Sequence, residues 1–86
     1  MVYGYSVDII ISKHAKERIK TYDLIEKTVI ESIKNPDHVS EGHSGTLIAH
    51  KSVNEHLLRI VYEKEENRIK VITVYPAKKG RYLKRK

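Results

Sequence analysis

Hydrophobic residues recur at helical spacing near the start of the chain. Ile11, Ala15 and Ile19 are spaced four residues apart, so they line one face of a helix. Ser12 lies at the start of this stripe and belongs to the residue types that cap helix N-termini. The apolar run at 7–11 predicts either a short strand or a buried lead-in to this helix.

A second helix is predicted in the segment that follows. Asp23 and Glu26 have the spacing of a capping box. The apolar positions that form one face of this helix are Ile25, Val29, Ile30 and Ile33. Pro36 disfavours helical geometry in the residue before it, so we expect the helix to stop at Asn35.

Beyond Pro36 the pattern changes to short runs rich in β-branched and apolar residues. The runs that predict strands are 38–41, 46–53, 56–64 and 69–76, with turn signals at 42–45 and 65–68. Because the turn before the last run is short, we expect the last two strands to form an antiparallel hairpin.

The last two runs are apolar on both faces. In the first run, Leu58, Ile60 and Tyr62 alternate with Leu57, Arg59 and Val61. In the second, Ile69, Val71, Thr73 and Tyr75 alternate with Lys70, Ile72 and Val74. This pattern is typical of interior strands with helices on one face. We therefore predict one α+β domain over 1–86, with two N-terminal helices packed on a twisted antiparallel sheet of about four strands and a basic C-terminal tail at about 78–86.

The composition favours a cytoplasmic protein that binds anions. Seventeen Lys and Arg residues against eleven Asp and Glu give a formal charge of +6, which favours phosphate polymers or acidic partners. There is no cysteine, as is usual in a reducing compartment. The N-terminal segment has neither the charge pattern of a signal peptide nor the length of a membrane span, so we expect no membrane association.

Three segments together resemble a known protein family. They are 14–18 (HAKER), 35–39 (NPDHV) and 68–85 (RIKVITVYPAKKGRYLKR). In this order they are similar to the DUF4258-type proteins, which are grouped with the RelE/ParE-like toxins and the wider fold of barnase and colicin nucleases. The resemblance covers essentially the whole chain. It implies a RelE/ParE-like fold, metal-independent RNA cleavage, and a type II toxin–antitoxin system with an acidic antitoxin as partner.

The resemblance also implies which positions form the site. Carried over residue by residue, its motifs fall on His14, Arg18, Thr73, Tyr75, Arg81 and Tyr82. Related toxins frequently carry an arginine near the position at which this chain has Tyr75, so the chain departs from the family pattern there.

His14 and Arg18 suit metal-free RNA cleavage chemically. The reaction needs a base for the 2′-hydroxyl, positive charge near the phosphorane oxygens and a proton for the leaving oxygen. Histidine serves the proton steps, and the arginine fork meets phosphate oxygens in pairs. The alternative is that His14 bonds the backbone at the helix start while Arg18 pairs with a carboxylate.

The strands and the tail supply further candidates. Arg59 interrupts an apolar strand face, so its guanidinium must reach solvent or a partner across the sheet. Tyr75 has the chemistry to bind phosphate or stack on a base, although such a tyrosine also packs at the edge of a core. We therefore predict His14, Arg18, Arg59, Tyr75 and Arg81 as catalytic residues. The predicted RNA-binding residues are Thr73, Lys78, Lys79, Tyr82, Lys84 and Arg85. The alternative for the basic tail is a solvated, frayed end.

The other histidines do not predict a metal site. His38, His43, His50 and His56 match no zinc-binding spacing along the chain, and there is no cysteine. We therefore expect neither a metal nor another cofactor.

The leading prediction is a toxin-like domain that cleaves RNA, either free or bound to the ribosome. Two rivals remain open at this point: a non-catalytic RNA- or protein-binding module of the same fold, and a ParE-like inhibitor of a protein target such as gyrase. Whether the chain forms a homodimer also stays open.

Overall fold

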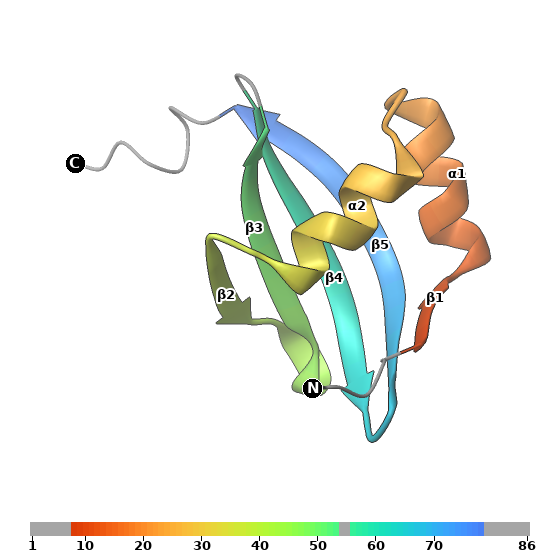
Figure 1. Ribbon diagram of the computed structural model, residues 1–86, viewed down its shortest axis with the longest axis vertical. Coiled ribbons are helices and arrows are strands. Elements are labelled where there is room, and N and C mark those ends of the chain that lie inside the picture. The colour runs from red at the N-terminus through yellow and green to blue at the C-terminus, as the bar shows by residue number, and fades with distance from the viewer. Residues whose placement is uncertain (1–7, 54–55, 79–86) are drawn as a thin grey trace, which may run out of the picture.

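The computed structural model describes residues 8–53 and 56–78 as an α+β domain (Figure 1). Its elements in chain order are β1 (Asp8–Ile11), α1 (Lys13–Thr21), α2 (Glu26–Lys34), β2 (His38–Glu41), the 3-10 turn η1 (His43–Gly45), β3 (Leu47–Val53), β4 (His56–Glu65) and β5 (Arg68–Lys78). Neither helix in these ranges has the length and apolar character needed to cross a membrane.

The sheet has five strands in the order β1-β5-β4-β3-β2. Adjacent pairs from β5 to β2 are antiparallel, as predicted, but β1 pairs with β5 in parallel. The predicted antiparallel arrangement is therefore confirmed for the four strands β2 to β5, but the sheet has a fifth strand, β1, which is parallel to its neighbour. The apolar run before the first helix forms this fifth strand, which pairs with the free edge of β5.

The two helix starts differ in how well the sequence predicted them. The Ser12 hydroxyl caps α1 by accepting from the backbone N–H of Ala15 at 3.1 Å, as predicted. The same hydroxyl donates to the Ile72 carbonyl at 3.1 Å, which ties the start of α1 to β5. The predicted capping box at Asp23 is wrong, because α2 begins at Glu26 and Ile25 occupies its N-cap position.

The loop between the helices explains the later start of α2. The backbone N–H of Asp23 donates to the Lys20 carbonyl at 3.1 Å, and that of Leu24 donates to the Ile19 carbonyl at 2.8 Å. Asp23 adopts a left-handed conformation with φ of 57°. These hydrogen bonds belong to the end of α1. The loop therefore extends to Ile25, and α2 begins only after it. At its other end α2 stops at Lys34 with Asn35 as C-cap, as predicted.

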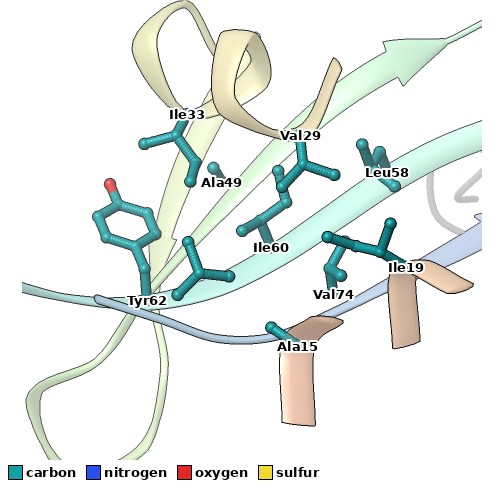
Figure 2. Packing of buried hydrophobic residues seen from close by; sticks show 10 residues of the cluster. Ala15, Ile19, Val29, Ile33, Ala49, Leu58, Ile60, Tyr62 and Val74 are labelled. Carbon is teal, nitrogen blue, oxygen red and sulfur yellow. The ribbon is translucent and has the colours of Figure 1, made fainter. Parts of the chain in front are cut away.

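Both helices cover the same face of the sheet. α1 packs on β5, and α2 packs on β3 and β4. Figure 2 shows Val29 and Ile33 of α2 among the strand side chains. The core between helices and sheet consists of Ala15, Ile19, Val29, Ile33, Ala49, Leu58, Ile60, Tyr62, Val71 and Val74. The opposite face of the sheet carries no described helix.

A β-bulge in β5 changes which side chains face the helices. Tyr62 pairs with Val71, but Val61 pairs with Thr73, so Ile72 is the extra residue. Val71 and Val74 both face the core as a result, while Thr73 and Tyr75 face away from the helices. The prediction that Val71 shares a face with Thr73 and Tyr75 is therefore wrong, because strict alternation fails at the bulge.

Candidate functional site

Four polar residues lie in one row across the helix-free face of the sheet. His38 of β2 is directly opposite His50 of β3, His50 is opposite Arg59 of β4, and Arg59 is opposite Tyr75 of β5. Directly paired residues project from the same face, with Cβ atoms roughly 5 Å apart. Arg59 alternates with core residues of β4, which places this cross-strand row on the face away from the helices.

Side-chain contacts divide the cross-strand row into two halves. In the first half, the rings of His38 and His50 lie with their centroids 5.3 Å apart and their planes tilted by 40°. The Ser40 hydroxyl lies 2.9 Å from Nε2 of His50, within hydrogen-bond distance. In the second half, Cζ of Arg59 lies 5.2 Å from the centre of the Tyr75 ring, in cation–π geometry. The strand pairing of His50 with Arg59 joins the halves.

The surroundings of His50 favour its neutral form. Partial burial lowers the pKa of His50 below 6.5, and the charges of Arg59 and His38 lower it further. A neutral imidazole is the form that accepts a proton. His50 is therefore the member of the row that is best placed to act as a general base near neutral pH.

Arg59 brings a permanent positive charge to the centre of the row. An arginine side chain stays protonated, and its planar fork binds two phosphate oxygens at once. Stacking on the Tyr75 ring restricts the orientation of that plane. His50, Arg59 and Tyr75 are all half-buried, whereas His38 is exposed, so the row combines partial shielding from water with access for a ligand.

The structure brings together only some of the predicted site residues. Arg59 and Tyr75 are in contact, and Thr73 lies two residues before Tyr75 in β5, on the same face. His14 and Arg18 lie on α1, where Nε of Arg18 donates to Nε2 of His14 at 3.4 Å. Because α1 packs on the helix-covered face, this pair lies on the other side of the sheet from the cross-strand row.

Most of the basic tail lies beyond the part of the chain that the structure describes. Lys78 is the last residue of β5 and pairs with His56 of β4. The predicted RNA-binding or catalytic residues outside the described ranges are Lys79, Arg81, Tyr82, Lys84 and Arg85.

The sequence-based prediction missed His38, Ser40 and His50. The histidines were considered only for metal-ligand spacing along the chain, and no group of three or more potential ligands forms within 8–53 and 56–78. The signal that would have found them was the turn at 42–45. The hairpin is centred on Ser44 within this turn, which places residue 38 opposite residue 50.

The fold and the cross-strand row define an α+β domain with a polar site on its helix-free sheet face. The chain belongs to the DUF4258 family, because the family model described as "Domain of unknown function (DUF4258)" matches residues 11–76. The match confirms the DUF4258 part of the predicted resemblance and spans all four residues of the row. Searches of curated proteins and of solved structures gave no match for the chain.

Proposed function

We propose that this protein is a RelE/ParE-like toxin domain that binds RNA on its helix-free sheet face and cleaves it without a metal. The observation that carries the proposal is the cross-strand row, in which two imidazoles, a guanidinium and a phenol lie side by side on one face of the sheet. These are the groups that metal-free phosphodiester cleavage requires. The formal charge of +6 supports an anionic substrate.

Each member of the row has a distinct role in the proposed reaction. His50 takes the proton from the 2′-hydroxyl, because its lowered pKa keeps the ring neutral. Arg59 binds the phosphate and stabilises the charge that develops on its oxygens. His38 returns a proton to the leaving 5′-oxygen, and Tyr75 holds the guanidinium plane or stacks on a base.

His14 and Arg18 remain a competing assignment for the catalytic pair. Their direct contact on α1 keeps the base-and-clamp combination that the sequence predicts. The half-buried environment and the lowered pKa of His50 favour the cross-strand row instead.

The test is incubation of the pure protein in EDTA with labelled total RNA and with translating ribosomes. Wild type is compared with His50→Ala, Arg59→Ala and His14→Ala. His43→Ala is the matched control, since His43 is an exposed histidine in η1 outside the row. We expect cleavage that survives EDTA, persists in the control and is lost in His50→Ala and Arg59→Ala. Loss in His14→Ala alone would move the site to α1, and intact RNA in every reaction would contradict cleavage.

A non-catalytic RNA-binding module is the second candidate function. The Arg59–Tyr75 stack favours it, because a cation and an aromatic ring together bind nucleic acid without any proton transfer. Under this alternative Arg59→Ala weakens RNA binding, His50→Ala leaves it nearly unchanged, and no cleavage is seen.

A further inference from the structure

An apolar pocket lies on the helix-covered side of the sheet, where the α1–α2 loop meets the ends of β3 and β5. Its volume is about 310 Å³, at the lower end of the range for ligand-binding cavities. The residues that give it apolar walls are Tyr22, Leu24, Ile25, Val53, Leu58 and Pro76, and the polar residues that line it are Asp23, Thr28 and His56. The pocket therefore suits a single side chain that is mainly apolar and carries a polar group.

Two large apolar side chains of this lining are left in contact with water. Ile25 is 66% exposed and Tyr22 is 41% exposed. Ile25 also occupies the N-cap position of α2, where Ser, Thr, Asp or Asn stabilises a helix better. An isoleucine here gives the helix no advantage, and exposed apolar groups beside a pocket indicate an interaction site.

The register of the sheet decides which terminal segment can reach this pocket. Segments 1–7 and 79–86 lie outside the described ranges. The first joins β1 at Asp8, which pairs with Arg68, and Arg68 is about 26 Å along β5 from Pro76. Seven fully extended residues span at most about 25 Å, so this segment falls short of the pocket. The second segment continues β5 from a point only about 7 Å beyond Pro76.

The sequence of segment 79–86, KGRYLKRK, supplies a suitable side chain at that distance. Gly80 allows the chain to reverse, because glycine adopts backbone conformations that are closed to other residues. A reversal there brings Tyr82 back level with residue 78, beside the pocket. A buried phenol usually forms a hydrogen bond, and the polar residues that line the pocket supply partners for it.

Charge gives this contact a smaller, orienting contribution. Asp23 lines the pocket and Glu26 begins α2, and neither belongs to an ion pair formed within the described part of the chain. Arg81, next to Tyr82, has the opposite charge. Because lysines of both helices are also close by in the sequence, the apolar anchor supplies most of the binding free energy.

We propose that segment 79–86 folds back at Gly80 and inserts the Tyr82 ring into this pocket, with Arg81 beside Asp23. The contact ties the end of β5 to the loop between the helices and covers Ile25. Because the connection is short, the effective concentration of the segment at the pocket is high, so a weak contact is enough. The pocket lies on the opposite side of the sheet from the cross-strand row, so the contact does not depend on RNA cleavage.

The first part of the test uses the absence of tryptophan from the chain. In the full-length variant Tyr82→Trp the indole is the only one present, and its fluorescence reports its exposure to water. Lys86→Trp is the matched control, at the far end of the same segment. We expect Tyr82→Trp to emit at shorter wavelength than the control and to be quenched less by acrylamide.

A second substitution locates the contact. Ile25→Ser removes the apolar group and introduces a favourable N-cap, so α2 is kept. Ile10→Ser is its control, because Ile10 is also exposed, at 42%, but lies in β1. We expect Ile25→Ser to return the emission of Tyr82→Trp to that of an exposed indole, and Ile10→Ser to leave it unchanged.

Thermal unfolding tests the same contact without a new aromatic residue. Tyr82→Ala should lower Tm by about 4 °C or more, because a buried aromatic side chain contributes measurably to the stability of a domain of this size. The same substitution in the Ile25→Ser background should change Tm far less. In the Ile10→Ser background it should lower Tm as in wild type.

Four results would overturn the proposal. Equal emission of Tyr82→Trp and Lys86→Trp, with no change of Tm in Tyr82→Ala, means that the segment is solvated. Emission that is unaffected by Ile25→Ser places the ring elsewhere, and a shift that disappears on dilution places it on a second copy. Emission that moves to shorter wavelength only when RNA is added makes Tyr82 a nucleic-acid contact. A failure of RNA cleavage alone leaves the proposal intact, because the expected results are measured without RNA.

Discussion

The same strands contribute core residues to one face of the sheet and polar residues to the other face. On the helix-covered face, β4 contributes Leu58, Ile60 and Tyr62 to the core, each at most 6% exposed. On the other face, the same strand presents Arg59 between His50 and Tyr75. Neighbouring residues of one strand therefore belong in turn to the core and to the proposed site. Substitutions one position apart should produce different kinds of defect.

The bulge at Ile72 determines which side chains of β5 face the core and which face the cross-strand row. On the turn side of the bulge Val71 faces the core, and on the far side Val74 faces it as well. Without the extra residue, Val74 would lie opposite Arg59 and Tyr75 would turn toward the helices. Bulges are common beside functional sites because they re-aim side chains in this way. The cross-strand row thus depends on one irregularity of the sheet.

The largest expected effect comes from the helix-covered face. Ile60 is fully buried in the core, so Ile60→Ala should lower the free energy of unfolding by about 2–5 kcal/mol. Urea denaturation followed by circular dichroism measures the change. The neighbouring substitution Arg59→Ala serves as the comparison, and a larger loss there than at Ile60 would contradict the division between the faces.

On the open face, the expected effect is on RNA affinity. Arg59→Lys keeps the charge but loses the planar fork that binds two phosphate oxygens. Hydrogen bonds to charged groups contribute about 1.5–3 kcal/mol, so we expect RNA affinity to fall by about tenfold or more. Titration with a non-cleavable 2′-O-methyl oligonucleotide checks this. Equal affinities of wild type and Arg59→Lys for the oligonucleotide would mean that Arg59 does not bind phosphate.

We expect a smaller effect on stability from substitution of Ser12, which links α1 to the bulge in β5. Ser12 caps α1 and also bonds the Ile72 carbonyl at the bulge. Ser12→Ala should lower the free energy of unfolding by about 1 kcal/mol through loss of the cap. Ser12→Asn, which retains a capping oxygen, should recover most of this loss in the same urea experiment. No recovery would show that the bond to Ile72 is the dominant contribution.

The smallest effect is a pH dependence that originates in the cross-strand row. Because the pKa of folded His50 lies below 6.5, the unfolded chain binds more protons than the folded chain as pH falls below that value. The contribution of His50 to stability is therefore complete above pH 6.5 and is lost as pH drops through the folded pKa. Unfolding measured at pH 7.5, 6.5 and 5.5 should show a shallower decline in His50→Asn than in wild type. An identical decline would contradict the assigned pKa direction.

The sequence predicted the local features of the fold because they depend on local periodicity. The cap at Ser12, the stop at Asn35 and the alternation of β4 all follow from a few adjacent residues. The parallel pairing of β1 with β5 joins segments about sixty residues apart, and no local pattern specifies it. The sequence pattern does not predict the bulge at Ile72 either, because β-branched residues surround it on both sides.

The candidate site was predicted in part for a related reason. Arg59 was identified because it interrupts an apolar strand face, and Tyr75 because a motif of the family resemblance falls on it; their contact then required the shifted register of β5. His38 and His50 were missed because their proximity comes from pairing across the β2–β3 turn. His14 and Arg18 were adjacent along α1 as expected, but the packing of that helix separates them from the row.

We propose that RNA binds on the helix-free face of the sheet. The most direct measurement is nuclear magnetic resonance of the labelled protein during titration with a 2′-O-methyl RNA oligonucleotide. We expect the largest shifts at the side chains of His38, His50, Arg59 and Tyr75, with little change along α1. Shifts concentrated at His14 and Arg18, with the cross-strand row unaffected, would contradict it.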